Sequence, residues 1–441
     1  QQLADGLLWP DPLIQLNPSF KQGALIDDLV SEGVLHEICR KVFQIKPEAD
    51  SVGKPLRLHQ HQEEAVRIAR GGDNYILTTG TGSGKSLAYI IPIVDSILRN
   101  GSGKGIQAII VYPMNALANS QLGELKKFLQ HGFPNQKGPV TFERYTGQES
   151  DEDKKRIMAN PPDILLTNYV MLELILTRPD ERTTLVRAAQ GLKFFVLDEL
   201  HTYRGRQGSD VALLVRRVRN ALSGDHLQCI GTSATLAGGE GTYHEQQAEV
   251  AQVATKIFGA DVKPEHVIGE TLRRATPEGS LDNTNFRTAL KERVQNAKVK
   301  PSDDYNKFIN DPLSTWIENT FGITNEIGSE RIIRATPSSI TGEMGASQRL
   351  SKSLELPLEQ CEEAIMEGLL AGYDVLYPET DTPVFAFRLH QFISRGDTVY
   401  TSIEAGEERY ITVHGQKFVP GDRDKVLLPL AFCRECGQEY F

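Results

Sequence analysis

A glycine-rich segment with the residue types needed to hold phosphate groups lies between an apolar run and a helical pattern. It reads Thr79-Gly80-Thr81-Gly82-Ser83-Gly84-Lys85-Ser86. Glycines let the backbone approach phosphate oxygens, and the N-terminus of the following helix favours negative charge. Lys85 would contact the β and γ phosphates, and the Ser86 hydroxyl would bind Mg²⁺. The segment predicts a nucleotide-binding P-loop, although Thr79 stands where the general pattern has glycine. The alternative is an ordinary glycine-serine turn before a helix.

Two adjacent carboxylates follow a second apolar run, residues 194–197. They open the sequence Asp198-Glu-Leu-His201. An Asp at the end of a buried strand can hold Mg²⁺ through its water shell, and an adjacent Glu can polarise the attacking water. We therefore predict Lys85, Asp198 and Glu199 as the catalytic set, with ATP and Mg²⁺ as cofactors. The alternative is a solvated acidic pair on a surface turn, which the position behind a P-loop disfavours.

Short apolar, β-prone runs alternate with amphipathic helical patterns from residue 56 to about residue 274. The runs cover residues 75–78, 108–112, 164–167, 194–197 and 227–232. Strands that are apolar throughout, with helices between them, predict a parallel sheet covered on both faces. We expect an α/β domain over residues 55–275, with its ligands at the carboxyl ends of the strands, where the motifs fall.

The ordered motifs of this region resemble those of superfamily 2 helicases of the DEAD/DEAH-box (DExH) kind. They are Gln62, the segment 79–86, Tyr112-Pro-Met-Asn-Ala-Leu117, the box 198–201 and Ser233-Ala-Thr235. The resemblance implies a RecA-like P-loop NTPase lobe in which Gln62 reads adenine. It also implies that His201, Ser233, Ala234 and Thr235 couple hydrolysis to movement.

A further group of residues falls where this family contacts a nucleic-acid backbone. It comprises Pro113, Asn115, Thr146, Gly147, Thr167 and Asn168. The segment after the acidic box, residues 202–209, and a cysteine pair near the end resemble YprA-type and Hrq-type DNA helicases and their relatives in the phage-defence systems DISARM and Druantia. The resemblance implies an ATP-dependent DNA helicase or translocase, with a role in defence or DNA repair. Two alternatives stay open: an RNA helicase, because the motifs grip the backbone and do not identify the sugar, and an ATP-binding scaffold in a defence complex with a protein partner.

Composition restricts the function only weakly. The net charge of −10 does not suggest a nucleic-acid binder, but a local basic track would suffice for one. No apolar run reaches the length of a membrane span, and the first residues lack the basic region of a signal peptide. Five cysteines in 441 residues are too few for a disulfide framework. We therefore expect a cytoplasmic chain without membrane contact; the absence of an initiator Met suggests residues upstream.

The flanks of the α/β domain read differently. Residues 1–54 predict an extension that is helical over 26–43, and residues 276–373 predict a linker followed by a helical accessory domain. The stretch 345–373 fits either a helix-turn-helix unit or an interdomain spacer, and we favour the spacer. Residues 374–441 predict a β-rich segment.

A cysteine pair with the spacing of a zinc knuckle ends this segment, Cys433-x-x-Cys436. Four ligands are needed for tetrahedral zinc, so the pair predicts half a site. The alternative is a pair of reduced structural cysteines.

A second RecA-like lobe is not evident in the remaining sequence. Residues 276–441 hold no Gln-x-x-Gly-Arg-x-x-Arg pattern and no second alternation of strands and helices. In comparable NTPases the arginines of a second element stabilise transition-state charge. We therefore expect this chain to be part of a longer protein, or to receive its second lobe from a partner.

Overall fold

The computed structural model describes most of the chain and divides it into two compact units. The described residues are 12–46, 53–80, 82–203, 205–222, 226–234, 242–296, 302–326, 329, 331–378, 380–390, 399–414, 416–432 and 438–440. One unit is Phe20–Leu272; the other joins Gln1–Ser19 to Arg273–Phe441. Each unit is described by itself below.

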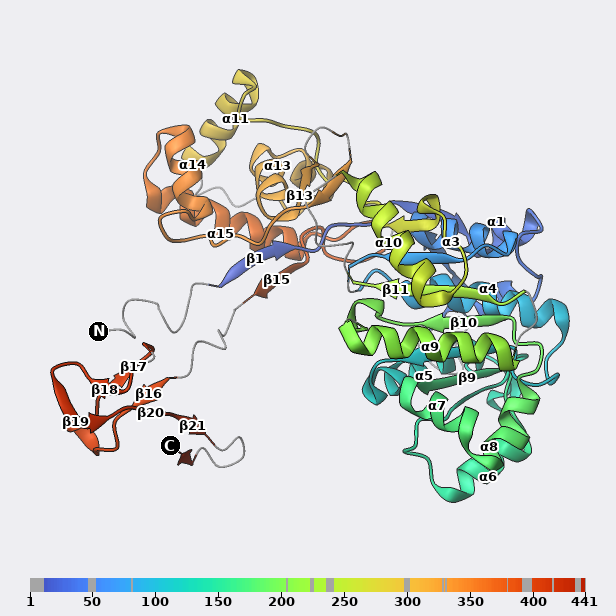
Figure 1. The fold of residues 1–441 in the computed structure, drawn as a ribbon. Coiled ribbons are helices and arrows are strands. Elements are labelled where there is room, and N and C mark those ends of the chain that lie inside the picture. Colours follow the sequence, from blue (N-terminus) through green and yellow to red (C-terminus); the bar gives the residue numbers. More distant parts are fainter. Residues whose placement is uncertain are drawn as a thin grey trace. The chain divides into compact units, whose positions relative to one another are not determined.

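A seven-stranded parallel sheet forms the centre of the unit Phe20–Leu272 (Figure 1). Its order is β12 (Val267–Gly269), β6 (Tyr75–Thr78), β11 (Gln228–Ser233), β10 (Phe194–Leu197), β7 (Ala108–Tyr112), β9 (Ile164–Asn168) and β8 (Phe142–Arg144). The expected α/β lobe and its five expected strands are confirmed, with ends that differ by at most one residue.

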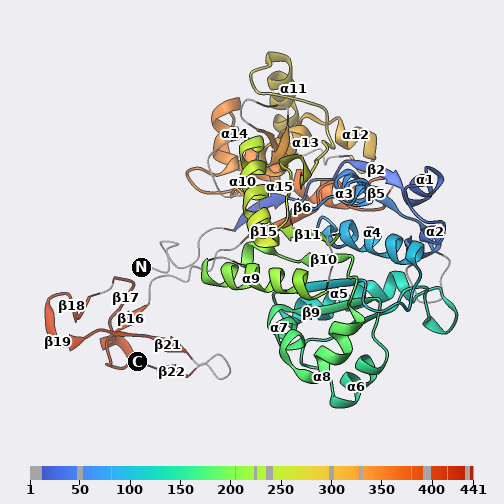
Figure 2. The ribbon, with the colours of Figure 1, turned by 45° about the vertical axis from the view of Figure 1, so that its right-hand side comes forward.

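Alternate residues of each strand enter opposite cores, because successive side chains of a strand point to opposite faces. In β7, Ile110 and Tyr112 join one core, whereas Ile109 and Val111 join the other. The first core is covered by α3 (Gln60–Gly71), α4 (Lys85–Asn100) and α5 (Asn115–Leu129), and the second by α7 (Tyr169–Thr177), α9 (Gly205–Leu222) and α10 (Tyr243–Phe258) (Figures 1 and 2). Burial on both faces explains why the strands are apolar throughout. Short helices α6 (Asp151–Ala159) and α8 (Pro179–Glu181) complete the second side.

The segment before residue 55 is part of this lobe, which differs from the expected boundary. The helical pattern over 26–43 is interrupted at Gly33, whose positive φ of 76° ends the run, and the chain forms α1 (Ile26–Ser31) and α2 (Cys39–Val42). Ile26 and Leu29 of α1, Val42 of α2 and the adjacent Phe43 are buried in the core that α4 covers. Strand β2 (Gln22–Leu25) also pairs with β5 (Arg57–His59), and β3 (Gln44–Ile45) pairs with β4 (Lys54–Pro55). The lobe therefore begins at Phe20.

The other unit contains a helical core. Its helices are α11 (Thr284–Gln295), α12 (Tyr305–Ile309), α13 (Pro312–Ile317), α14 (Ala346–Leu354) and α15 (Leu358–Asp374). The expected linker is wrong in part, because Asn283 caps α11 and its Leu290 and Val294 are buried. The strand β1 (Leu13–Leu16) pairs with β15 (Phe387–His390), and β13 (Ile323–Asn325) pairs with β14 (Ile332–Arg334). None of the described helices of the chain is long and apolar enough to cross a membrane.

Short antiparallel strands follow from residue 400. They are β16 (Tyr400–Thr401), β17 (Ile411–Thr412), β18 (Phe418–Val419), β19 (Asp422–Val426), β20 (Leu428–Pro429), β21 (Ala431–Phe432) and β22 (Glu439–Tyr440). Within the described ranges, the sheets outside the central one have two or three strands. Cys433 and Cys436 lie outside the described residues, and among those that are described no three His, Cys, Asp or Glu side chains gather as metal ligands.

Candidate nucleotide and nucleic-acid site

The P-loop connects β6 to α4 at the carboxyl edge of the sheet. Gly82 and Gly84 have positive φ of 84° and 71°, a conformation that favours glycine, and α4 begins directly afterwards at Lys85. A Cβ at Gly84 would lie 2.5 Å from Nε2 of Gln62, so the loop and this amide are closely fitted. Thr81, which was predicted to bind phosphate, lies outside the described residues.

Thr79 stands at the motif's first glycine position, and its side chain makes a hydrogen bond within the loop. It is fully buried, and its hydroxyl lies 2.6 Å from that of Ser83, so the two ends of the loop are hydrogen-bonded to each other. Its neighbour Gly80 donates its backbone N–H to the carboxylate of Glu270 at 3.3 Å. No sequence motif indicated Glu270, which contacts an amide of the phosphate cradle from the far end of the lobe's sequence.

Gln62 and its neighbour His61 hold the loop from α3. The Gln62 Nε2 donates to the carbonyl of Gly84 at 2.9 Å, and its Oε1 accepts from the backbone N–H of His59 at 2.8 Å. His61 is fully buried, with Nε2 2.9 Å from the carbonyl of Ser83, and burial lowers the pKa of its imidazole. A neutral ring that donates from Nε2 fits this contact. His61 carried no motif signal beyond its position beside Gln62.

The two predicted catalytic acids follow β10, next to the P-loop. Glu199 has a left-handed backbone, with φ of 54°, and its Oε1 lies 3.3 Å from the Nζ of Lys85. Thr232 on β11 connects the pair: its hydroxyl donates to Asp198 Oδ1 at 2.5 Å and accepts the backbone N–H of Glu199 at 3.0 Å. Thr232 was not predicted, because a threonine inside an apolar strand gives no sequence signal.

Asp198 is a buried carboxylate beside the P-loop. Only 8% of its surface is exposed, and this burial raises the pKa of its carboxyl from 3.8 to about 6. The hydrogen bond from Thr232 lowers the same pKa by a smaller amount. The neighbouring Tyr89 hydroxyl bonds to Ser86, and burial, with the charge of Asp198 next, raises the pKa of that phenol. The hydroxyl of Ser86 and the carboxylate of Asp198 are thus oxygen ligands close to one tyrosine, and they fit Mg²⁺.

His201 joins the acidic box to the segment predicted to couple hydrolysis to movement. Its Nδ1 lies 3.2 Å from Glu199 Oε2, 3.4 Å from the backbone nitrogen of Ala234 and 3.5 Å from the Ser233 hydroxyl. One ring nitrogen therefore neighbours both the predicted catalytic glutamate and the end of β11. Thr235, the last residue of the predicted coupling group, lies outside the described residues.

Five of the six predicted nucleic-acid residues line one cavity of about 490 Å³, namely Pro113, Asn115, Thr146, Gly147 and Asn168. Asn168 organises it: Nδ2 donates to the side chain of Asn115 at 2.7 Å and to the carbonyl of Thr146 at 3.1 Å, while Oδ1 caps α7. Lys154 and Arg178 also line the cavity, a positive contribution that the motifs did not indicate.

Thr167 is separate from this lining. It is fully buried, and its hydroxyl donates to the carbonyl of Tyr145 at 2.7 Å. This position suits a residue that supports the neighbouring loop. The other five residues remain the predicted nucleic-acid contacts.

Comparison with known proteins identifies the family of the region that carries these motifs. A family model described as DEAD/DEAH box helicase matches residues 59–240. This region belongs to the DEAD/DEAH box helicase family.

The chain also resembles individual proteins of this kind. It is 30% identical over 366 residues to the uncharacterized ATP-dependent helicase YprA of Bacillus subtilis, covering 79% of this chain and 45% of that protein. It is 25% identical over 395 residues to the Druantia protein DruE of Escherichia coli, covering 64% of this chain and 21% of that protein. It is 32% identical over 200 residues to the ATP-dependent helicase HRQ1 of Saccharomyces cerevisiae, covering 44% and 18%.

The predicted resemblance to YprA-type, Hrq-type and Druantia proteins is thereby confirmed. This chain spans less than half the length of each of these DEAD/DEAH box relatives.

Proposed function

We propose that this chain is the nucleotide-binding lobe of an ATP- and Mg²⁺-dependent DNA helicase or translocase. One observation carries the proposal: the P-loop, the acidic pair and the asparagine-lined cavity all lie at the carboxyl ends of parallel strands of one sheet. The P-loop follows β6, Asp198 follows β10, and Asn168 ends β9. Ligands of open α/β sheets bind at this edge.

Each residue of the nucleotide site has a proposed role. Lys85 would bind the terminal phosphates, and Ser86 with Asp198 would hold Mg²⁺, which supplies positive charge to the phosphate oxygens when it is bound. Glu199 would orient the attacking water and accept its proton, after Lys85 has left it for phosphate. Gln62 would hold the P-loop through Gly84 and read adenine. His201, adjacent to Glu199 and to Ser233 and Ala234, would transmit the state of the site.

The nucleic-acid cavity would bind a backbone segment of the strand. Its asparagine side chains and backbone groups can donate to phosphate oxygens, and Lys154 and Arg178 supply charge. We propose DNA because the region after the acidic box resembles YprA-type and Hrq-type DNA helicases. The resemblance to DruE supports a role in phage defence, which extends this proposal to a protein partner.

Further parts of the proposal concern elements beyond the lobe. A second RecA-like lobe, in the same protein or in a partner, would complete the site with transition-state arginines. Cys433 and Cys436 would provide two of four zinc ligands, which metal analysis of the purified chain and of a Cys433→Ser variant would test. The low cysteine content suits a cytoplasmic location.

The test is ATP hydrolysis by this chain with single-stranded DNA, duplex DNA and RNA, compared with Lys85→Ala. We expect ATP binding that Lys85→Ala abolishes and hydrolysis that DNA stimulates when the second lobe is present in a longer chain. Equal stimulation by RNA would favour the RNA helicase. Binding of ATP without stimulated hydrolysis, even in the longer chain, would favour the scaffold and overturn the motor.

A further inference from the structure

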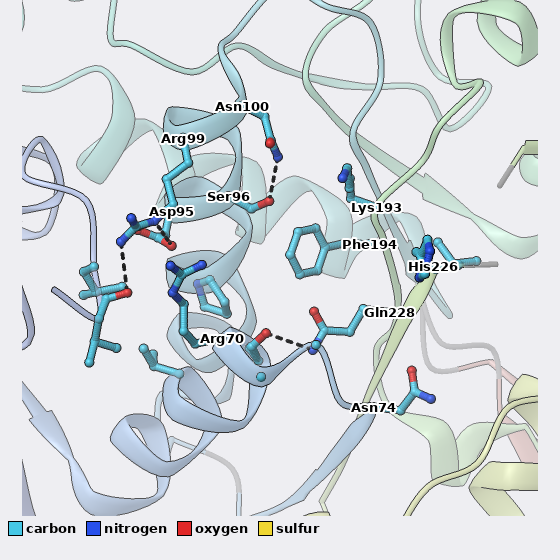
Figure 3. Close-up of a pocket in the computed structure, with 18 of the residues that line it drawn as sticks. Arg70, Asn74, Asp95, Ser96, Arg99, Asn100, Lys193, Phe194, His226 and Gln228 are labelled. Atoms are coloured by element: carbon cyan, nitrogen blue, oxygen red, sulfur yellow. Dashed lines mark hydrogen bonds and ion pairs between the residues drawn. The ribbon is translucent and has the colours of Figure 1, made fainter. Parts of the chain in front are cut away.

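A second cavity lies at the opposite edge of the same sheet, among the amino ends of its strands. Its volume is about 520 Å³, within the usual range for small-molecule sites. Residues at the starts of β10 and β11 line one side, and the last turns of α3 and α4 line the other (Figure 3). The cavity's first lining residue on α4 is Pro92, which lies roughly 10 Å along the helix from Lys85 of the P-loop.

The charge of this cavity is strongly positive. Four lining side chains are cationic, Arg70, Arg99, Lys193 and Arg219, and one is acidic, Asp95. The acidic charge is already matched, because Asp95 accepts two hydrogen bonds from Nε of Arg99 and one from the backbone of the chain before α2. Arg70 and Lys193 are exposed and have no ion-pair partner in the part of the chain that the structure describes.

Helix ends explain part of this charge but not all of it. Arg70, Arg99 and Arg219 lie in the last turns of α3, α4 and α9, where a cation complements the helix dipole. Lys193 precedes β10 and has no helix end to complement. It also faces the cavity beside Phe194, together with His226 (Figure 3). Lys193 from the strand side and Arg70 from the helix side therefore line the same cavity.

The remaining lining of the cavity is mixed, with polar side chains such as Asn74, Ser96 and Asn100 beside apolar ones. Pro92, Val34, Leu35 and Leu227 contribute, and the ring of Phe194 lies between the helix side and the strand side in Figure 3. Several polar side chains there already have partners: Gln228 Nε2 donates to the carbonyls of Ala69 and Asp73, and Asn100 Nδ2 donates to the Ser96 hydroxyl. The cations left to bind a ligand are therefore Arg70 and Lys193, with the edge of the Phe194 ring beside Lys193.

We propose that this cavity binds a small organic anion, a phosphate ester with an aromatic or other apolar body. Arg70 and Lys193 would bind the phosphate oxygens, for which the guanidinium offers paired donors. Phe194 and its apolar neighbours would contact the body of the ligand. A ligand held there would join α3 and α4 to β10 and stabilise the lobe by binding only its folded state.

Phenyl phosphate, which has both features, is the probe. Its binding is measured from the broadening of its ³¹P resonance in a Lys85→Ala background, which removes the phosphate-binding lysine of the P-loop. We expect a Kd of about 1 mM or tighter, as suits a ligand of this size. Arg70→Gln and Lys193→Gln should each weaken binding about tenfold, because each removes a charge-assisted hydrogen bond. Both side chains are exposed, so neither substitution should prevent folding.

The controls separate this site from general attraction of anions. Lys127→Gln removes an exposed cation from α5 in the same unit and should leave binding unchanged. Inorganic phosphate and phenol should each bind at least tenfold more weakly than phenyl phosphate. Unchanged affinity in the double variant Arg70→Gln/Lys193→Gln would overturn the proposal. So would an absence of binding at ten times the expected Kd, or an equal affinity for inorganic phosphate, which would leave Phe194 without a role.

Discussion

Replacing Asp198 by Asn should stabilise the nucleotide-free lobe while abolishing ATP hydrolysis. The carboxyl is buried, and its pKa rises from 3.8 to about 6 on folding. Between these two values the folded chain holds a proton that the unfolded chain has lost, so stability falls as the pH rises through this window. Above about pH 6 the carboxylate is charged in both states, and its burial then lowers the free energy of unfolding by the full amount that the pKa difference implies.

The magnitude follows from the size of the pKa change. At 1.36 kcal/mol per pH unit, a rise of about 2 units costs about 3 kcal/mol at pH 8. At pH 4.5, where the folded carboxyl is mostly protonated, the same relation gives about 1 kcal/mol. Asn keeps the oxygen that accepts the Thr232 hydroxyl but has no charge to bury, so Asp198→Asn should remove most of this cost.

The assay is chemical denaturation of both proteins at pH 8 and pH 4.5, with the difference between them compared at each pH. Asp198→Asn should be more stable by about 1–3 kcal/mol at pH 8, with a difference about 2 kcal/mol smaller at pH 4.5. The exposed Asp210, on α9, gives the matched control, and Asp210→Asn should show no such dependence. A loss of stability in Asp198→Asn that is equal at both pH values would refute the reasoning.

Three further substitutions test the site. Gly84→Ala should destabilise the lobe by about 1–3 kcal/mol and abolish ATP binding, because φ is 71° and the new Cβ meets Gln62; calorimetry and nucleotide titration measure both. Thr232→Val removes a hydrogen bond that lowers the pKa of Asp198, so the acidic limb of the pH–rate profile should move to higher pH. Asn168→Ala should reduce DNA stimulation at least tenfold and leave DNA-independent hydrolysis within twofold, with a helix-cap loss of about 1 kcal/mol; equal losses of both rates would contradict its placement.

The central lobe and most of the nucleotide site could be predicted from the sequence, because parallel-sheet geometry ties one to the other. An apolar run followed by glycines or by acidic residues identifies both a strand and its carboxyl end. The runs 75–78 and 194–197 therefore predicted two strands together with the P-loop and the acidic pair that follow them. Residues whose function depends on packing could not be predicted. Thr232 occupies a buried strand and Glu270 follows β12, and only the fold brings them to Asp198 and Gly80.

The predicted N-terminal boundary of the lobe, at residue 55, was wrong for a related reason. Residues 20–46 form only short helices and strands, and their periodic pattern looked like a separate extension. Most of their apolar residues are instead buried in the core that α4 covers, and the backbone N–H of His36 donates to the buried Asp95 at 2.5 Å. Because Asp95 also holds Arg99, this segment fixes an ion pair in the last turns of α4.

The contact between His36 and Asp95 joins the segment 20–46 to α4. The first residue of α4 is Lys85, whose ammonium contacts Glu199, and its last turns carry Asp95 and Arg99. The segment therefore packs against the same helix whose first residue contacts the predicted catalytic glutamate. The segment before Phe43 is thus an integral part of the lobe, although none of its residues belongs to a helicase motif.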